Sequence, residues 1–288
     1  MSATQSRREP PYVKVAEWGG AGEAPGRFHD PTGIAVAGDR VFVADARNSR
    51  IQVFSVEGVF LYAFPEAGDA ITLGRPMNLD ISGNHLFVAD YDRDEAVVFT
   101  LDGDFVRAFG ASGEAEGLLD SPSGIAALAD GGVVVVDFYG RRFQSFDAAG
   151  SFRSALAGGR TFIFPSDVAV RPDGGLVFAE GYAHRLHLVS PEGVIERSFG
   201  GFHGVRLPGM GFPAWFKTVS SIAVDPQGRI AATDFYNGRV QVFDARGYFL
   251  TNFGEDDFDK PFGIAAGEDG RLYVVDTTTS QVSVWRRP

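Results

Sequence analysis

The sequence of 288 residues contains no cysteine, which excludes disulfide bonds, thiolate metal sites and cysteine nucleophiles. Basic residues are also scarce: 26 Lys and Arg stand against 37 Asp and Glu, so the formal net charge is −11. A general nucleic-acid-binding surface is basic, so this charge argues against one. No apolar run approaches the roughly 18 residues of a membrane span, and the N-terminal residues lack the apolar stretch of a secretory signal. We therefore expect a cytoplasmic protein without a membrane segment.

Glycine and phenylalanine, in contrast, are abundant, with 37 and 26 copies. Glycine is typical of tight turns, and phenylalanine supplies a large apolar core. Their source is a repeat whose plainest copy spans residues 31–64 and reads as four short strands. The second strand of every copy ends in an acidic residue. These anchor acids are Asp45, Asp90, Asp137, Glu180, Asp234 and Asp276.

An apolar residue closes the third predicted strand nine positions after each anchor acid. These residues are Phe54, Phe99, Phe146, Val189, Phe243 and Trp285. Periods of about 40 to 50 residues with four strands each are typical of β-propeller blades. The pattern predicts an all-β, six-bladed β-propeller with four-stranded antiparallel blades.

The sixth copy stops after its third strand, and the missing fourth strand is found near the N-terminus. Residues 12–19 match the other fourth strands, with Trp18 at the position of their terminal phenylalanine. We expect this strand to join the C-terminal blade and close the ring, which removes two open sheet edges. Residues 1–11 are predicted to be a disordered tail, and 12–288 a single propeller. The blades are predicted at about 28–64, 73–109, 119–156, 162–199, 216–253 and 258–288.

The residues of the repeat resemble NHL repeats. The resemblance rests on Pro-x-Gly-Ile-Ala-Val, then Val-x-Val-Ala-Asp, then Asn-x-Arg-Ile-Gln-Val-Phe, and residues 42–54 and 231–243 match closely. It covers residues 12–288 and implies a six-bladed propeller of the NHL type. It does not imply an activity, because this fold serves scaffolds and enzymes alike.

Loops that join strand two to strand three, and strand four to the next blade, open on one face, here called the upper face. Variation among these loops is expected to mark the binding surface. The longest four-to-one connection spans 200–218 and contains candidate binding residues. They are His203, Arg206, Trp215 and Lys217, and His29 lies in another loop of this face. The alternative is an insertion that packs its aromatic residues onto blades four and five.

Tyrosines follow the anchor acids in the two-to-three turns. They are Tyr91, Tyr139, Tyr182 and Tyr236, and the last three lie two residues after the acid. We interpret them as binding residues around the mouth of the channel, where they could stack on a ligand or a partner peptide. Packing between neighbouring blades is an equally good alternative.

The position five residues after each acid is expected to close the turn by a charge-assisted hydrogen bond. It is occupied by Arg50, Glu95, Arg142, Arg185, Arg239 and Gln281. Blades two and six break the pattern, which is either drift or an acid left for a ligand.

Catalytic chemistry has little support in the sequence. NHL-like peptide-amidating lyases, which residues 166–182 resemble, place zinc-binding histidines directly after the proline of strand one. This chain has Thr32, Met77, Ser123, Ser166, Ser220 and Phe262 there, so that zinc site is not carried over. Tyr182 matches a tyrosine near their reaction centre. We expect no cofactor; the alternatives are zinc on His29, His184 and His203, or calcium on Asp30, Asp120 and Asp259 at the mouth.

The favoured function is a monomeric scaffold that binds a protein or peptide through its upper face. The first alternative is a lyase or hydrolase acting on a small polar molecule in the channel, with Tyr182, His203 and Arg206 as catalytic candidates. The second alternative is RNA binding, which the net charge disfavours. It would need a local basic patch from Arg75, Arg141, Arg142, Arg160, Arg206, Lys217 and Lys260.

Overall fold

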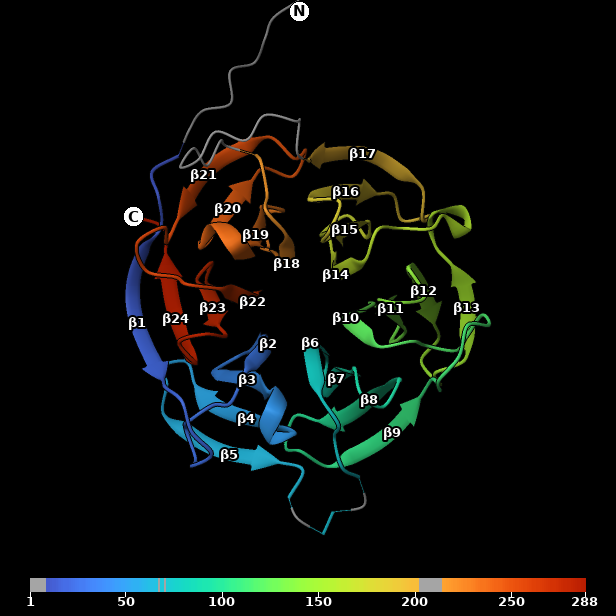
Figure 1. Cartoon of the computed structure of the whole chain (residues 1–288), viewed down its shortest axis with the longest axis horizontal. Coiled ribbons are helices and arrows are strands. Elements are labelled where there is room, and N and C mark those ends of the chain that lie inside the picture. Colours follow the sequence, from blue (N-terminus) through green and yellow to red (C-terminus); the bar gives the residue numbers. More distant parts are fainter. Residues whose placement is uncertain (1–8, 67, 70, 202–213) are drawn as a thin grey trace, which may run out of the picture.

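The computed structural model describes residues 9–66, 68–69, 71–201 and 214–288. Six sheets of four antiparallel strands are arranged as a ring around a central axis (Figure 1). This confirms the predicted six-bladed β-propeller. Among the residues described here, no helix is long and apolar enough to cross a membrane.

Blades one to three follow each other along the chain, each with its first strand nearest the axis (Figure 1). Blade one contains β2 (Pro31–Ala37), β3 (Arg40–Asp45), β4 (Arg50–Ser55) and β5 (Phe60–Phe64). Blade two contains β6 (Pro76–Ser82), β7 (His85–Asp90), β8 (Glu95–Thr100) and β9 (Phe105–Phe109). Blade three contains β10 (Pro122–Ala127), β11 (Val133–Asp137), β12 (Arg142–Phe146) and β13 (Phe152–Ala155).

Blades four to six complete the ring. Blade four contains β14 (Pro165–Val170), β15 (Leu176–Glu180), β16 (Arg185–Val189) and β17 (Ile195–Gly200). Blade five contains β18 (Val219–Val224), β19 (Ile230–Asp234), β20 (Arg239–Phe243) and β21 (Phe249–Phe253). Blade six contains β22 (Pro261–Ala266), β23 (Leu272–Asp276), β24 (Gln281–Arg286) and, as its outer strand, β1 (Val13–Gly19).

Strand β1 closes the ring as the sequence predicts. It pairs antiparallel with β24, from Val13 opposite Arg286 to Gly19 opposite Gln281. The Trp18 ring lies 6.1 Å from Phe54 of blade one and 6.5 Å from Tyr273 of blade six, between ring centroids. The N-terminal strand therefore belongs to blade six and packs against blade one, so it joins these two blades.

The core consists of apolar layers between neighbouring blades. In β3, Val41 to Ala44 are all buried, because each face of the strand packs against an adjacent sheet. Phe143 of blade three stacks on Phe178 of blade four with ring centroids 3.8 Å apart. The second and third strands are thus buried on both faces, whereas the outer strand β9 has exposed positions.

The six first strands approach each other closely at the axis. A Cβ atom on Gly33 would lie 2.6 Å from the Cα atom of Asn78, and one on Gly263 would lie 2.0 Å from the Thr32 carbonyl oxygen. Packing therefore requires glycine at these two positions. Across the axis, Asn78 Nδ2 donates a hydrogen bond of 2.6 Å to Asp167 Oδ1. This layer lies between an upper and a lower cavity.

Candidate binding site at the upper mouth of the channel

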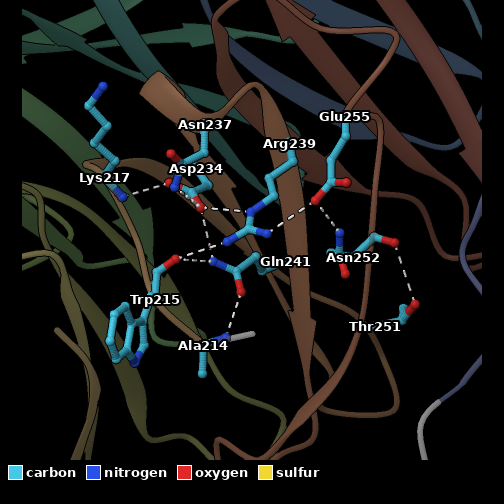
Figure 2. Close-up of polar contacts among 10 residues, drawn as sticks. All are labelled: Ala214, Trp215, Lys217, Asp234, Asn237, Arg239, Gln241, Thr251, Asn252 and Glu255. Atoms are coloured by element: carbon cyan, nitrogen blue, oxygen red, sulfur yellow. Dashed lines mark hydrogen bonds and ion pairs between the residues drawn. The ribbon is translucent and has the colours of Figure 1, made fainter. Parts of the chain in front are cut away.

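The loops of the upper face are held by the anchor acids, and blade five shows how (Figure 2). The Lys217 backbone N–H donates to Asp234 Oδ1 at 2.7 Å, and Arg239 Nε donates to Asp234 Oδ2 at 2.9 Å. Arg239 and Gln241 both donate to the Trp215 carbonyl oxygen, at 3.1 and 2.9 Å. The buried acid thereby positions the segment that carries Trp215 and Lys217.

Acid–arginine pairs are confirmed in blades one, three and five. The distances are 2.8 Å for Asp45–Arg50, 2.7 Å for Asp137–Arg142 and 2.9 Å for Asp234–Arg239.

The pair predicted for blade four is wrong. Glu180 Oε2 lies 2.9 Å from His187 Nε2, and Glu180 Oε1 accepts a hydrogen bond of 2.6 Å from the Ile163 N–H. Burial raises the pKa of Glu180, but the His187 hydrogen bond and the Ile163 amide together hold it below its usual value. The imidazole and the amide thus take the place of Arg185 at this carboxylate.

In blades two and six, the acids without an arginine bind loop backbone instead. Asp90 accepts hydrogen bonds from the N–H groups of Gly74 and Arg75, both at 2.8 Å. Asp276 accepts them from Asp259 and Lys260, at 2.7 and 2.9 Å. Blades two and six have therefore lost the arginine five residues after the acid, while the acid still holds the loop through its backbone.

The sequence interpretation missed a glutamine seven residues after the acid in blades one, three and five. Gln52, Gln144 and Gln241 donate to the anchor acids of their blades, at 2.9, 3.2 and 3.0 Å. The signal was present in the Ile-Gln-Val-Phe part of the repeat. An amide on an otherwise apolar, fully buried strand needs a partner, and the acid is the nearest one.

A cavity of about 270 Å³ lies at the upper mouth of the channel. Of the predicted tyrosines, it brings together Tyr91, Tyr182 and Tyr236. Sequence reasoning missed the phenylalanines of its lining, which are Phe138, Phe164, Phe235 and Phe262. Phe138 and Phe235 directly follow an anchor acid, so the Phe-Tyr pair after the acid was an available signal. The cavity is therefore predominantly aromatic.

The aromatic rings form a continuous row across blades two to four. Ring centroids are 6.3 Å apart for Tyr91–Tyr139, 6.2 Å for Tyr139–Phe164 and 5.3 Å for Phe164–Tyr182. Tyr139 and Tyr182 are nevertheless 52% and 59% exposed, and Tyr236 is 54% exposed. Burial, followed by the neighbouring Tyr139 hydroxyl, raises the pKa of Tyr91 to about 12. Tyr139 and Tyr182 thus pack against aromatic rings of the row and also expose part of their surface, which a ligand could contact.

Hydroxyl groups at the base of the cavity join neighbouring blades. Ser166 Oγ donates to the Val219 carbonyl oxygen at 2.8 Å, and Ser220 Oγ lies within hydrogen-bond distance of the Pro261 and Phe262 carbonyl oxygens, at 3.1 and 3.0 Å. Their protons are engaged, so these oxygens can offer a ligand only acceptor sites. Among the described residues, the lining contains one charged side chain, Arg75, and no carboxylate or imidazole.

The other predicted site residues lie around this cavity or apart from it. Lys217 Nζ lies 5.5 Å from the ring centroid of Tyr236. The carbonyl oxygen of Trp215 faces the Asp234 network, and its indole extends away from that network (Figure 2). His29 is exposed in its loop and is not part of the lining. His203 and Arg206 lie outside the described residues.

The metal alternatives gain no ligand cluster from the described part of the chain. There, no three His, Asp or Glu side chains converge in a way that could hold an ion. Asp30, one of the calcium candidates, forms ion pairs with Arg47 and Arg75, at 3.1 and 3.2 Å.

The lower cavity, of about 280 Å³, is aliphatic apart from Asn78, Asp80 and Asp167. Asp167 Oδ2 accepts hydrogen bonds from Ser221 Oγ at 2.7 Å and from the Ile222 N–H at 2.8 Å. Burial raises the pKa of Asp80 to about 6 and that of Asp167 to about 7.

These carboxyl groups should make the protein more stable in mild acid. Their folded-state pKa values exceed the ordinary value of about 4, so the folded protein binds protons that the unfolded chain releases. The stabilisation is complete below about pH 4 and is lost as the pH rises through about 6 to 7. The unfolding free energy of the wild type, measured by urea titration, should fall between about pH 5 and about pH 8. In Asp167→Asn this fall should be smaller by on the order of 2–4 kcal/mol. Exposed Asp39→Asn is the control; an equal fall in wild type and Asp167→Asn would contradict the assignment.

Comparison with known proteins supports the repeat and the fold. The NHL repeat model matches residues 28–54 and 216–243. No curated protein matches the chain. A streptogramin B lyase structure is 13% identical with a TM-score of 0.64, over 96% of this chain and 97% of that one. Virginiamycin B lyase from Staphylococcus aureus is 15% identical with a TM-score of 0.61, over 88% and 94% of the two chains.

The WD40 propeller domain of Doa1 is 12% identical with a TM-score of 0.65, over 96% of this chain and 97% of that one. At such identities the likeness concerns the fold alone, which enzymes and non-enzymatic domains share. The ring of four-stranded blades makes the chain a six-bladed β-propeller, and two of its repeats match the NHL repeat model.

Proposed function

We propose that this protein is a binding module that holds a segment of a partner protein in the aromatic cavity of its upper face. The observation that carries the proposal is the cavity of about 270 Å³, lined by three tyrosines and four phenylalanines. Exposed tyrosines around a pocket are typical of residues that contribute strongly to protein binding. The volume lies just below the range of drug-sized ligand sites, so it suits one or two side chains of a peptide.

The chemistry of the lining favours binding over catalysis. Tyr91, whose pKa is about 12, stays a neutral phenol near pH 7, so it is a poor general base. The serine hydroxyls donate to backbone carbonyl oxygens and are not activated by an adjacent base. The catalytic candidates on this face are Tyr182, His203 and Arg206. Of these, His203 and Arg206 lie outside the described residues.

The proposal is tested with a phage-displayed library of random linear peptides, selected on the intact protein. Enriched peptides should bind the wild type in calorimetry, and Tyr182→Ala and Tyr236→Ala should each raise Kd by about tenfold. Each substitution removes a large aromatic contact at the cavity, and neither side chain is buried in the core. Melting temperatures should therefore stay close to that of the wild type.

Tyr248→Ala is the matched control, because Tyr248 is 48% exposed but precedes the outer strand β21, away from the cavity. It should leave Kd unchanged. Absence of any enriched peptide, or peptides that bind the Tyr182 and Tyr236 variants as tightly as the wild type, would reject the proposed function.

A further inference from the structure

Charge is distributed unevenly over the upper face. The loops at 138–141, 157–164, 181–184, 214–218 and 235–238 contain no Asp or Glu. They contain three cations, namely Arg141, Arg160 and Lys217. We call these loops of blades three to five the basic sector. The loops at 91–94, 110–121 and 254–260 are rich in acids. The second leads from blade two into blade three and the third from blade five to blade six, so both border the basic sector.

The cations of the basic sector have no carboxylate partner among the described residues. Arg141 Nε donates to the Phe162 carbonyl oxygen at 2.7 Å, and no ion pair joins Arg141, Arg160 or Lys217 to an acid. On the opposite side of the mouth, Arg47 and Arg75 are both paired with Asp30. The anchor acids that directly precede the turns of this sector are buried and already paired. They are Asp137, Glu180 and Asp234, bound by Arg142, His187 and Arg239 respectively. In the described part of the chain these three cations thus form no ion pair, although the Arg160 charge also lowers the pKa of the buried Glu180.

Two of the cations lie over aromatic rings of the cavity lining. Lys217 Nζ is 5.5 Å from the ring centroid of Tyr236, and Arg141 Cζ is 5.7 Å from that of Phe164. Arg160 Cζ lies 5.2 Å from the ring of Phe162, a buried residue of the same 157–164 loop that is not part of the lining. A ligand that fills the cavity would thus meet positive charge directly beside its apolar group.

We propose that the partner segment is an acidic peptide. An apolar or aromatic side chain enters the upper cavity, and neighbouring Asp or Glu carboxylates contact Lys217, Arg160 and Arg141. This inference rests on the proposed function and specifies its partner. Complementary charge supplies orientation and partner choice. A longer polyanion is disfavoured, because beyond the sector it would meet the acidic loops of a protein with net charge −11.

The test uses the tightest peptide from the library selection, labelled for fluorescence anisotropy. Its sequence should carry Asp or Glu next to the apolar anchor. Lys217→Glu and Arg160→Glu should each raise its Kd by about tenfold, and more at low salt than at high salt. Arg246→Glu is the control, because Arg246 is an exposed cation in the turn before β21 and makes no side-chain ion pair among the described residues. A peptide with Lys in place of its acids should prefer the Lys217→Glu variant to the wild type.

The outcomes separate the two proposals. A peptide that depends on Tyr182 and Tyr236 but has no acidic residues, or is indifferent to both charge reversals, overturns the acidic partner and leaves the binding module intact. A random-sequence RNA that binds more tightly than the peptide and loses affinity in Lys217→Glu also overturns it. Peptides independent of both tyrosines overturn the proposed function itself.

Discussion

Deleting residues 1–18 is expected to lower the free energy of unfolding by more than about 5 kcal/mol, enough to leave much of the chain unfolded. The deletion removes nearly all of β1 and leaves β24 as an open edge. It also removes Tyr12, which is buried and stacks on Phe253 with centroids 5.1 Å apart. Blade one and blade six would then lose the strand that joins them.

Thermal unfolding and urea titration measure this effect, and single substitutions locate it. Trp18→Ala should cost about 3–5 kcal/mol, because the indole packs on Phe54 and Tyr273 and covers Gly58. Val15→Ala on the same strand is the control, since Val15 is 44% exposed, and it should cost less than about 1 kcal/mol. An unchanged melting temperature after the deletion would show that the ring closes without β1.

The second large effect is expected for Asp234→Asn, at about 3–5 kcal/mol of unfolding free energy. Asp234 Oδ2 accepts hydrogen bonds from Arg239 Nε, Gln241 Nε2 and Asn237 Nδ2, at 2.9, 3.0 and 2.9 Å. An asparagine that keeps its oxygen for Lys217 N–H turns its NH₂ group toward these three donors. The buried Arg239 guanidinium would also lose its carboxylate beside Nε.

Asp102→Asn is the matched control for this substitution. Asp102 also pairs with an arginine, Arg40, at 2.9 Å, but its side chain is 74% exposed. It should cost less than about 1 kcal/mol. The Asp234 network also holds the segment that carries Lys217. Asp234→Asn should therefore lower the affinity for the selected peptide, even though Tyr182 and Tyr236 are unchanged. Equal stability losses in the two variants would show that the buried network contributes no more than a surface pair.

Much of the fold could be predicted because it is encoded in short-range spacing. The sequence spacing of nine residues between Asp45 and Phe54 recurs between Asp234 and Phe243, because each pair spans one turn and the strand that follows it. The partner of each acid was less predictable. Arg239 reaches Asp234 as expected, but at Glu180 the imidazole of His187 occupies that role, and only the packed strand shows which side chain reaches the carboxylate.

The candidate site was predictable in part for the same reason. Tyr182 and Tyr236 share a position after the anchor acid, so their common face follows from the repeat. Phe164 and Phe262 were not identified, because a phenylalanine beside a strand is most simply interpreted as core. Their place in the cavity depends on how blades from distant parts of the sequence meet at the mouth.

By itself, the sequence determined the six blades, their strand order and closure by residues 12–19, because periodic spacing and alternation are local properties of the chain. Only the tertiary structure decided that Asn78 binds Asp167 across the axis and that two cavities lie on either side of that layer. It also decided that Arg141, Arg160 and Lys217 form no ion pair with an acid of the described residues. These features join blades far apart in sequence. They depend on how closely the inner strands approach, which no local pattern encodes.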